Sequence, residues 1–421
     1  MNRALSATLS VLLLAGCGLA PGLGRPAALD LSAASAGKAW TYAALSASDN
    51  DLSEDAVVLE RAARRQAGLP NVAPVLFVDR DKADDSLRIY PGPKGAVAEA
   101  MPELDSESPA AMRDLLRFAA KVAPAKRRLL VLADHGGGII RGINSDDHRP
   151  RGGPGYSVGD FAEVLRADPV DILYFDACFM QMVEVAHEFG GGEAAVILAS
   201  ESETTSGSAP HAGFMQTLDE GSRLGTDAAA ARLVEAGAAM ARKDATLSAV
   251  RPAAVRDLVE PLRKLSGALL AAMREDPALK GKLREAMGGA VQYVHETDPH
   301  YALYNSYRDL GDVLDRIAAV SRAEVAAQAR ALAALVRRDV VIGHVEARTF
   351  AGSSGITIYA PAGEIVDAGY VKTDFARKTR WADFLVALNS GGKWANPVQP
   401  DKYPDAFKRP RGVVTTPPQQ D

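Results

Sequence analysis

The strongest constraint on the fold is a group of short apolar runs that have no polar face. The runs are LLVLA at 129–133, ILYF at 172–175 and AVIL at 195–198. A half-exposed strand alternates apolar and polar residues, whereas a continuously apolar strand is buried on both faces. Such strands are typical of parallel sheets covered by helices on each side. We therefore expect an α/β fold with a mostly parallel sheet.

Segments of helical periodicity alternate with these strands, as such a fold requires. Residues 225–338 have an almost entirely helical, Ala-rich pattern. Expected strands cover 38–47, 71–80, 86–92, 127–134, 170–177, 194–200, 340–348 and 355–363; expected helices cover 48–68, 107–123, 157–167, 179–189 and 380–389. We predict a core at 38–224, a helical region at 225–338, strands and a helix that complete the core at 339–390, and an irregular tail at 391–421.

The N-terminus has the pattern of an export signal. Arg3 precedes a short apolar stretch at 9–14, which is too short to span a membrane. The sequence LAGC that follows resembles a bacterial lipobox, so residues 1–16 are interpreted as a lipoprotein signal peptide, Cys17 as the lipidated residue and 17–37 as a tether. The alternative is an ordinary signal peptide. Gly18 favours the outer membrane or cell surface, because aspartate at that position would favour inner-membrane retention.

Composition excludes two broad classes of protein. The chain of 421 residues is 47% hydrophobic, enough for a large core, so a disordered protein is excluded. Its formal net charge is -5, without the excess of lysine and arginine that binds a phosphate backbone. We expect no nucleic-acid partner.

Two expected strands end in residues with reactive side chains. Asp134 and His135 follow the strand at 127–134, and Asp176 and Cys178 follow the strand at 170–177. In an open parallel sheet, ligands bind beyond the carboxyl ends of the strands. If these strands are neighbours, the side chains face the same crevice. The chain has two cysteines, so lipidation of Cys17 would leave Cys178 as an unpaired thiol in an exported protein, which requires a reason.

A thiol and an imidazole at one crevice are suited to nucleophilic catalysis. The imidazole of His135 can activate the Cys178 thiol and later protonate a leaving amine. The N–H groups of Gly136 and Cys178 are candidates for an oxyanion hole, and the glycines at 136–138 allow the backbone to approach a ligand closely. A helix starting at Cys178 would stabilise the thiolate. The alternative is that Cys178 is only a small buried apolar residue.

Several motifs resemble those of the clostripain family of cysteine peptidases. ADHGGG at 133–138 and FDACFMQMVEVAHE at 175–188 resemble its two active-site motifs, and further similarity extends from about 38 to 389. The family's catalytic histidine corresponds to His135 and its nucleophile to Cys178. The resemblance implies a caspase-like α/β/α sandwich with a helical C-terminal region, and an endopeptidase acting on protein or peptide substrates.

The resemblance also implies a preference for arginine or lysine at P1, the residue before the cleaved bond. Asp176 matches one acidic group of the S1 pocket, which binds that residue; the alternative is that Asp176 caps the helix of Cys178. The family often has a second aspartate in a Gly-Asp-Gly setting, where this chain has Gly207, Ser208 and Ala209. A buried cation is less well compensated by one carboxylate than by two. We therefore expect a weakened basic preference, with Ser208 lining the pocket.

Family members are often activated by cleavage between the histidine and cysteine strands, and are often calcium-dependent. We predict self-cleavage after Arg149 or Arg151 in the intervening loop. Asp146 and Asp147 are candidate calcium ligands, since calcium prefers carboxylate oxygens. The alternative is that these two loop acids are simply solvated.

Taken with the export signal, these features predict a lipid-anchored cysteine endopeptidase of the bacterial cell envelope. Its chemistry requires no cofactor, and calcium is the one candidate ion. One alternative is an inactive binding or assembly protein that has kept the same fold and anchor. The other is a thiol hydrolase that acts on small molecules.

Overall fold

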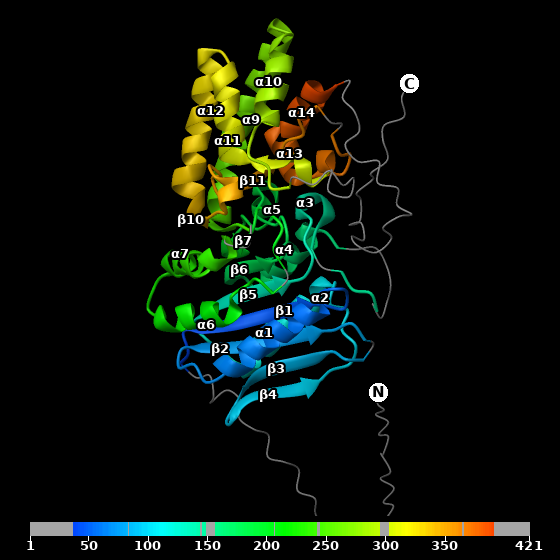
Figure 1. Ribbon diagram of the computed structural model, residues 1–421, viewed down its shortest axis with the longest axis vertical. Coiled ribbons are helices and arrows are strands. Elements are labelled where there is room, and N and C mark those ends of the chain that lie inside the picture. The colour runs from blue at the N-terminus through cyan, green and yellow to red at the C-terminus, as the bar shows by residue number, and fades with distance from the viewer. Residues whose placement is uncertain are drawn as a thin grey trace, which may run out of the picture. The chain divides into compact units, whose positions relative to one another are not determined.

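The computed structural model describes residues 37–390 except 83, 144, 149–155, 206, 242–244, 295–302 and 364–365, all within one compact unit. Its centre is a nine-stranded sheet of order β10-β8-β7-β6-β5-β1-β2-β3-β4 (Figure 1). The strands are β1 (Trp40–Ala47), β2 (Val72–Asp79), β3 (Leu87–Gly92), β4 (Gly95–Ala100), β5 (Arg127–Ala133), β6 (Val170–Asp176), β7 (Ala194–Ala199), β8 (Leu247–Val250) and β10 (Val341–Val345). A separate two-stranded sheet pairs β9 (Tyr307–Asp309) with β11 (Thr357–Tyr359).

The centre of the large sheet is parallel and its edges are antiparallel. Strands β2, β1, β5, β6 and β7 pair in parallel, whereas β3, β4, β8 and β10 pair antiparallel. The predicted mostly parallel α/β fold is therefore confirmed. The three continuously apolar runs lie in β5, β6 and β7, where both faces of the sheet are covered.

Helices form a hydrophobic core against each face of the sheet. On one face, Leu129 and Val131 of β5 pack in a cluster with α1, α6 and α7. On the other, Leu130 and Leu132 pack with α2, α4, α5 and α9. Alternate residues of one strand enter different cores because successive side chains point to opposite faces. The result is the three-layered α/β/α sandwich.

The helical part extends beyond one end of the sheet. In Figure 1, α9 to α12 stand together past β10, at the end opposite β3 and β4. The α-helices are α1 (Ser53–Gln66), α2 (Pro109–Val122), α3 (Gly138–Arg141), α4 (Val158–Ala167), α5 (Val183–Glu188), α6 (His211–Glu220), α7 (Thr226–Ala236), α8 (Ala238–Ala241), α9 (Pro252–Glu275), α10 (Leu279–Gly288), α11 (Leu310–Val320), α12 (Ala323–Leu335), α13 (Asp374–Thr379) and α14 (Trp381–Asn389). Short 3-10 or π segments are η3 (Tyr304–Ser306), η4 (Val336–Val340), η5 (Arg348–Phe350) and η6 (Tyr370–Lys372).

Three strands were not predicted. β8 and β9 interrupt the segment expected to be helical, and β4 lies at the sheet edge. β8 and β9 have only four and three residues, so neither is long enough to show a period of its own. β4 has the sequence GAVAEA and is partly exposed, without the apolar run of a central strand. Their pairing partners, rather than their local sequence, place them in sheets.

The helix after the cysteine is shorter than predicted. It was expected at 179–189 but covers only Val183–Glu188, so Cys178 does not begin it. Phe179 has a positive φ of 60°, which interrupts a helical path. The Phe179 N–H donates to Ser202 O at 3.1 Å and the Gln181 N–H donates to Ser200 O at 3.0 Å. These bonds hold residues 179–181 alongside the segment that follows β7.

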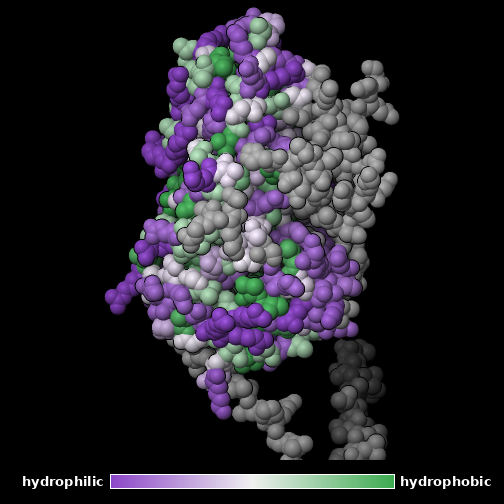
Figure 2. Space-filling view, viewed as in Figure 1, coloured by the Kyte–Doolittle hydropathy of each residue, from purple (hydrophilic) through white to green (hydrophobic). Residues whose placement is uncertain are grey.

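The surface provides little evidence of a broad apolar docking area. Over the described residues of the face in Figure 2, hydrophilic side chains predominate and hydrophobic ones lie in small groups. Large hydrophobic residues exposed in the described part of the chain are Val58, Leu224, Val371 and Val386. Among the helices described, none is long and apolar enough to cross a membrane.

Candidate active site

The carboxyl ends of β5 and β6 bring the two reactive segments together. The strands pair in parallel up to Ala133 opposite Asp176, and the Asp134 N–H donates to Asp176 O at 3.3 Å. His135 and Cys178 each lie two residues beyond this last pair. The strand register thus places the imidazole and the thiol at the same edge of the sheet, as expected for neighbouring parallel strands.

Gly136 makes the closest backbone contact between the two segments. A Cβ atom at this position would lie 2.3 Å from Cys178 O and 3.0 Å from Cys178 N. Any side chain would collide with the backbone of the cysteine, so only glycine allows this approach. Gly138 has a φ of 65°, and a Cβ there would lie 2.4 Å from Met182 Sδ. The glycines were expected to allow close approach to a ligand, and in the structure Gly136 instead allows close approach of the two active-site segments. The predicted oxyanion-hole residues, Gly136 and Cys178, meet at this contact.

His135 is held by two acidic residues, one of which was missed in the sequence. Its Nε2 atom lies 2.6 Å from Oδ1 of Asp51, in the loop after β1. An N–H at Nε2 donates to this carboxylate, which leaves Nδ1 as the acceptor nitrogen. Asp134, which is buried, accepts from the His135 N–H at 2.5 Å and from Asn50 Nδ2 at 2.9 Å. Burial holds the pKa of Asp134 well above its usual range.

The Cys178 thiol is half-buried, with the acidic residues Asp176 and Glu203 nearby. Its Sγ accepts a hydrogen bond from the Thr204 N–H at 3.3 Å, in the loop after β7. Burial raises the pKa of the Cys178 thiol to about 11, and the hydrogen bonds from Thr204 offset this only in part. The expectation that a helix dipole stabilises the thiolate was wrong, because the helix begins only at Val183. A thiol with this pKa is protonated at neutral pH.

The backbone at the nucleophile is strained. Phe179, the next residue, is one of three non-glycine residues with positive φ in the described chain. Such a conformation costs on the order of 1–3 kcal/mol and persists only where the surroundings enforce it. The Phe179 ring stacks on Tyr304 with ring centroids 4.4 Å apart, and this contact fixes the turn after the thiol.

Asp176 belongs to a hydrogen-bonded chain of side chains. Its Oδ2 lies 3.0 Å from His211 Nε2, and its Oδ1 accepts from the Tyr174 hydroxyl at 3.2 Å. Nδ1 of His211 in turn lies 2.8 Å from the Tyr42 hydroxyl. The alternative role of Asp176 as a helix cap was wrong, since Met182 is the N-cap of α5. His211 is buried at the start of α6.

The loop between β7 and α6 borders both the thiol and Asp176. Thr204 within it contacts Cys178, and His211 at its end contacts Asp176. Ser208 lies between them, and its N–H donates to Thr205 O at 2.9 Å. The Ser208 hydroxyl is buried and has no hydrogen-bond partner within the described part of the chain. In the sequence, this loop was identified as part of the S1 pocket by Gly207, Ser208 and Ala209, which stand where the family often has Gly-Asp-Gly.

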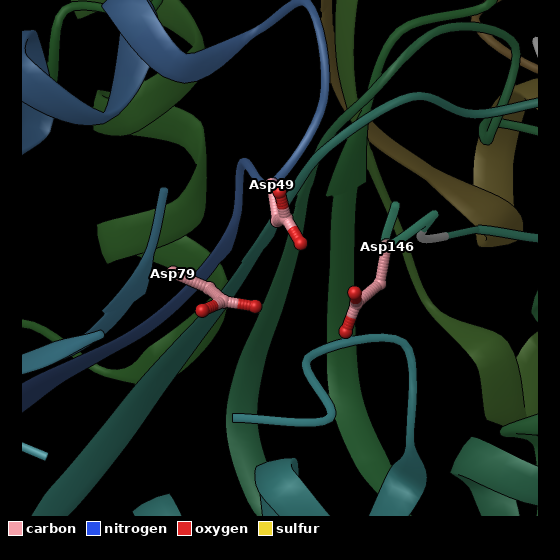
Figure 3. Close-up of side chains that lie close together, drawn as sticks. All are labelled: Asp49, Asp79 and Asp146. Carbon is pink, nitrogen blue, oxygen red and sulfur yellow. The ribbon is translucent and has the colours of Figure 1, made fainter. Parts of the chain in front are cut away.

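The remaining predicted site residues fall into two groups. Arg149 and Arg151, the predicted self-cleavage positions, and Cys17, the predicted lipidation site, lie outside the described residues. Asp146 is buried, whereas Asp147 is exposed. Carboxylate oxygens of Asp146, Asp49 and Asp79 lie within 4.8 Å of one another (Figure 3), and Asp147 is not part of this group.

Comparisons with known proteins agree with this fold. The family model described as "Clostripain family" matches residues 48–395. A secreted C11 cysteine protease from Bacteroides thetaiotaomicron, solved with an irreversible peptide inhibitor, has a TM-score of 0.60 at 15% identity, covering 82% of this chain and 99% of that one. An inactive zymogen C11 protease from Parabacteroides distasonis has a TM-score of 0.57 at 19% identity, covering 83% and 96%. No curated protein sequence matches.

The fold and the paired strand ends thus define a caspase-like sandwich that presents a histidine and a cysteine at one edge of the sheet. The chain belongs to the clostripain family of cysteine peptidases, because the family model matches most of its length. The similarity to the solved proteases, at this level of identity, supports the fold.

Proposed function

We propose that the protein is a cysteine endopeptidase in which Cys178 is the nucleophile and His135 transfers the protons. The observation that carries the proposal is the strand register that sets both residues two positions beyond the pair of Ala133 and Asp176. The fit of Gly136 against the Cys178 backbone supports it. A histidine and a cysteine at one edge provide a base and a nucleophile for acyl transfer.

The raised thiol pKa indicates how the nucleophile is generated. Burial raises the pKa of Cys178 to about 11, so the thiol and not the thiolate is the favoured form at pH 7. The Cys178 proton therefore passes to His135 as the substrate binds, and the sulfur attacks the carbonyl carbon of the peptide. Donation from Nε2 to Asp51 leaves Nδ1 of His135 to accept that proton.

The later steps use the groups at the same edge of the sheet. The N–H groups of Gly136 and Cys178 donate to the oxyanion of the tetrahedral intermediate. When the C–N bond breaks, His135 gives its proton to the leaving amine, and a thioester with Cys178 remains. His135 then takes a proton from water, whose oxygen attacks the thioester carbonyl and releases the acid and the thiol.

The proposed specificity is for arginine or lysine at P1, with Asp176 as the acidic group of the S1 pocket. His211 and Tyr174 already donate to this carboxylate, so it binds a P1 cation less strongly than a free carboxylate would. Ser208 in the adjacent wall offers a hydroxyl rather than a second charge. A moderate basic preference, with cleavage after neutral residues also detectable, follows from this arrangement.

We also propose that the enzyme is lipid-anchored and that it cleaves its own chain. Lipidation at Cys17 would hold it at the outer membrane or cell surface, and cleavage after Arg149 or Arg151 would separate the histidine and cysteine segments. The lipobox-like sequence and the arginines of the loop support these steps. Mass spectrometry of membrane fractions tests lipidation: the lipid should be present in the parent chain and lost in Cys17→Ser. An active preparation that remains one uncut chain would contradict self-cleavage.

The test of the peptidase activity uses residues 18–421 and fluorogenic peptides varied at P1. Cleavage after arginine or lysine that disappears in Cys178→Ala and His135→Ala supports the proposal. Cleavage that is confined to neutral P1 residues would keep the mechanism and contradict the specificity. No thiol-dependent cleavage, even after trypsin nicking within 141–151, would contradict the activity itself.

The runner-up is a binding or assembly protein that has kept the fold without catalysis. The placement of Cys178 favours it, because the thiol is half-buried and lies ahead of the helix instead of at its N-terminus, and burial raises its pKa. A peptidyl ketone with an acyloxy leaving group separates the two functions. A catalytic cysteine is alkylated by it at a rate that depends on His135, whereas an inert thiol reacts slowly and equally in His135→Ala.

A further inference from the structure

A row of buried side chains leads from the carboxylate of Asp176 into the interior. His211, the first residue of α6, lies next to the carboxylate, and Tyr42 of β1 lies behind the histidine. Tyr42 and His211 are buried, whereas 19% of the Asp176 side chain is exposed. The row therefore joins the proposed S1 carboxylate to two polar side chains that a substrate does not reach.

The hydroxyl of Tyr42 determines the direction of the hydrogen bonds in this row. Burial and, to a lesser extent, the negative charge of Asp176 raise the pKa of Tyr42 well above its usual range, so this hydroxyl keeps its hydrogen at neutral pH. Within the described chain, the acceptor that it reaches is Nδ1 of His211, 2.8 Å away. A buried hydroxyl hydrogen without an acceptor costs free energy. Tyr42 therefore donates to Nδ1.

This donation fixes where His211 carries its own hydrogen. A ring nitrogen that accepts a hydrogen bond carries no proton, and a neutral imidazole then has its hydrogen on the other nitrogen. His211 is thus the Nε2–H tautomer, which donates to Oδ2 of Asp176 at 3.0 Å. An imidazolium would carry hydrogen on both nitrogens, and the hydroxyl hydrogen of Tyr42 would lose its acceptor.

We propose that Tyr42 and His211 are positioning residues that hold the Asp176 carboxylate without cancelling its charge, so that it pairs with a basic P1 side chain. An imidazolium beside Asp176 would neutralise the carboxylate, whereas a neutral N–H orients it and leaves the negative charge for the substrate. The effect on substrate binding rests on the proposed S1 role of Asp176. The tautomer of His211 stands by itself.

The groups around His211 explain why the Tyr42 hydroxyl is decisive. Asp176 by itself would favour an imidazolium, because opposite charges attract. The rings of Tyr42 and Tyr174 lie against the imidazole, with centroids 6.3 and 6.1 Å from its own. Tyr174 is also buried and donates to Oδ1 of Asp176 at 3.2 Å, so its hydroxyl does not serve His211. Nδ1 therefore depends on Tyr42 for its hydrogen bond.

The first test observes the tautomer in Cys178→Ala, which has no nucleophile, so that no activity is required. Nitrogen-15 NMR at pH 7 distinguishes a ring nitrogen that carries hydrogen from one that does not, and loss of signals in His211→Gln assigns them. We expect hydrogen on Nε2 and not on Nδ1. In Tyr42→Phe, which removes the hydroxyl and keeps the ring, both nitrogens should carry hydrogen. Hydrogen on Nδ1 before the substitution, or an unchanged ring after it, would overturn the inference.

The second test measures binding of two peptides, with arginine or alanine at P1, to the same Cys178→Ala chain by titration calorimetry. Tyr42→Phe should lower the ratio of arginine to alanine affinity at least about fivefold, because an imidazolium then compensates Asp176. Tyr90→Phe on β3, whose hydroxyl also donates to a carboxylate, is the matched control and should leave the ratio unchanged.

A double variant separates charge from packing. Glutamine at position 211 cannot take up a proton, its amide can donate to Asp176, and its oxygen can accept from Tyr42. His211→Gln should therefore keep the affinity ratio, and Tyr42→Phe combined with His211→Gln should restore it. A double variant as weak as Tyr42→Phe would show that the hydroxyl acts through packing and would overturn the inference. Equal affinity for both peptides before any change in the row would contradict the proposed basic preference and the positioning role, while the tautomer result would stand.

Discussion

Asp51 and His135 are 84 residues apart in the chain, yet Oδ1 of the aspartate lies 2.6 Å from Nε2 of the histidine. The contact joins the loop after β1 to the loop after β5, and these two strands are neighbours in the sheet. Asp51 is largely exposed, whereas the histidine is mostly buried. The pair holds the imidazole through Nε2, which makes Asp51 a candidate positioning residue.

Replacing Asp51 by alanine should lower kcat by about 10- to 100-fold and leave KM nearly unchanged, because the imidazole loses its orientation and not its contact with substrate. Asp51→Glu should restore part of the rate, since it keeps the carboxylate. Steady-state kinetics of the two variants test this. A rise in KM without a change in kcat, or no benefit from glutamate, would contradict a positioning role.

Replacing Gly136 by alanine should abolish measurable activity while the protein still folds. The added Cβ would lie 2.3 Å from Cys178 O, so the two segments must separate and the thiol must move away from the imidazole. Gly281→Ala in α10 is the control, because no atom lies within 4 Å of its Cβ position. Peptide cleavage and circular dichroism measure the two effects. Full activity in Gly136→Ala would refute the proposed geometry.

Replacing Asp176 by asparagine should lower kcat/KM for peptides with arginine at P1 at least tenfold and change cleavage after alanine little. The side chain keeps its shape and its contact with His211, but it loses the charge that pairs with the P1 cation. Competition between the two peptides gives the ratio directly. An equal loss for both substrates would indicate that Asp176 acts on the nucleophile and not on the S1 pocket.

Replacing Ser208 by aspartate adds a carboxylate to the proposed S1 pocket. This change should strengthen the preference for arginine at P1. The Ser208 hydroxyl is buried without a partner among the described residues, so a carboxylate there needs a cation, which the substrate provides. The same competition assay should show an increased ratio of arginine to alanine cleavage. Ser208→Ala is the control and should leave that ratio unchanged. A fall in the ratio for Ser208→Asp would place Ser208 outside the S1 pocket.

Glu184 should make the folded state less stable as the pH rises. Burial raises the pKa of Glu184 from 4.5 to about 7, and its Oε1 accepts from the Tyr359 N–H and the Tyr370 hydroxyl, both at 2.9 Å. The folded-state pKa exceeds the unfolded one, so the stabilising effect of proton uptake is complete below pH 4.5 and is lost as the pH passes 7. The free energy of unfolding at pH 8 is thereby lower by up to about 3 kcal/mol.

Glu184→Gln removes this titration and keeps an oxygen that can accept both hydrogen bonds. Denaturant unfolding between pH 4.5 and pH 8 should show a smaller loss of stability for the variant than for the parent chain. Glu54→Gln, a change of an exposed residue in the first turn of α1, serves as the control. Parallel pH profiles for Glu184→Gln and the parent would show that the carboxyl group stays charged when buried.

The sequence by itself determined the sheet type and the two principal site residues. Continuous apolar runs require strands with both faces covered, because an exposed face would carry polar residues. The runs at 129–133 and 172–175 therefore indicated parallel strands, and the reactive residues just beyond them were expected at one edge if the strands were neighbours. The structure supplies that adjacency. Gly136 was also singled out, since a glycine run allows close backbone approach, although the expected neighbour was a ligand and not the Cys178 backbone. Each of these signals lies within a single short segment of the sequence.

Only the tertiary structure decided the partners of those residues. Asp51, His211 and Asp79 come from loops or strand ends far from the residues they contact, and nothing in their local sequence distinguishes them from solvated side chains. The helix after Cys178 starts later than its periodicity suggests, because Phe179 and Gln181 bond instead to the segment after β7. The high pKa of Cys178 likewise arises from burial, which many segments produce together. Long-range packing sets these features, and hydrophobic periodicity along the chain does not encode it.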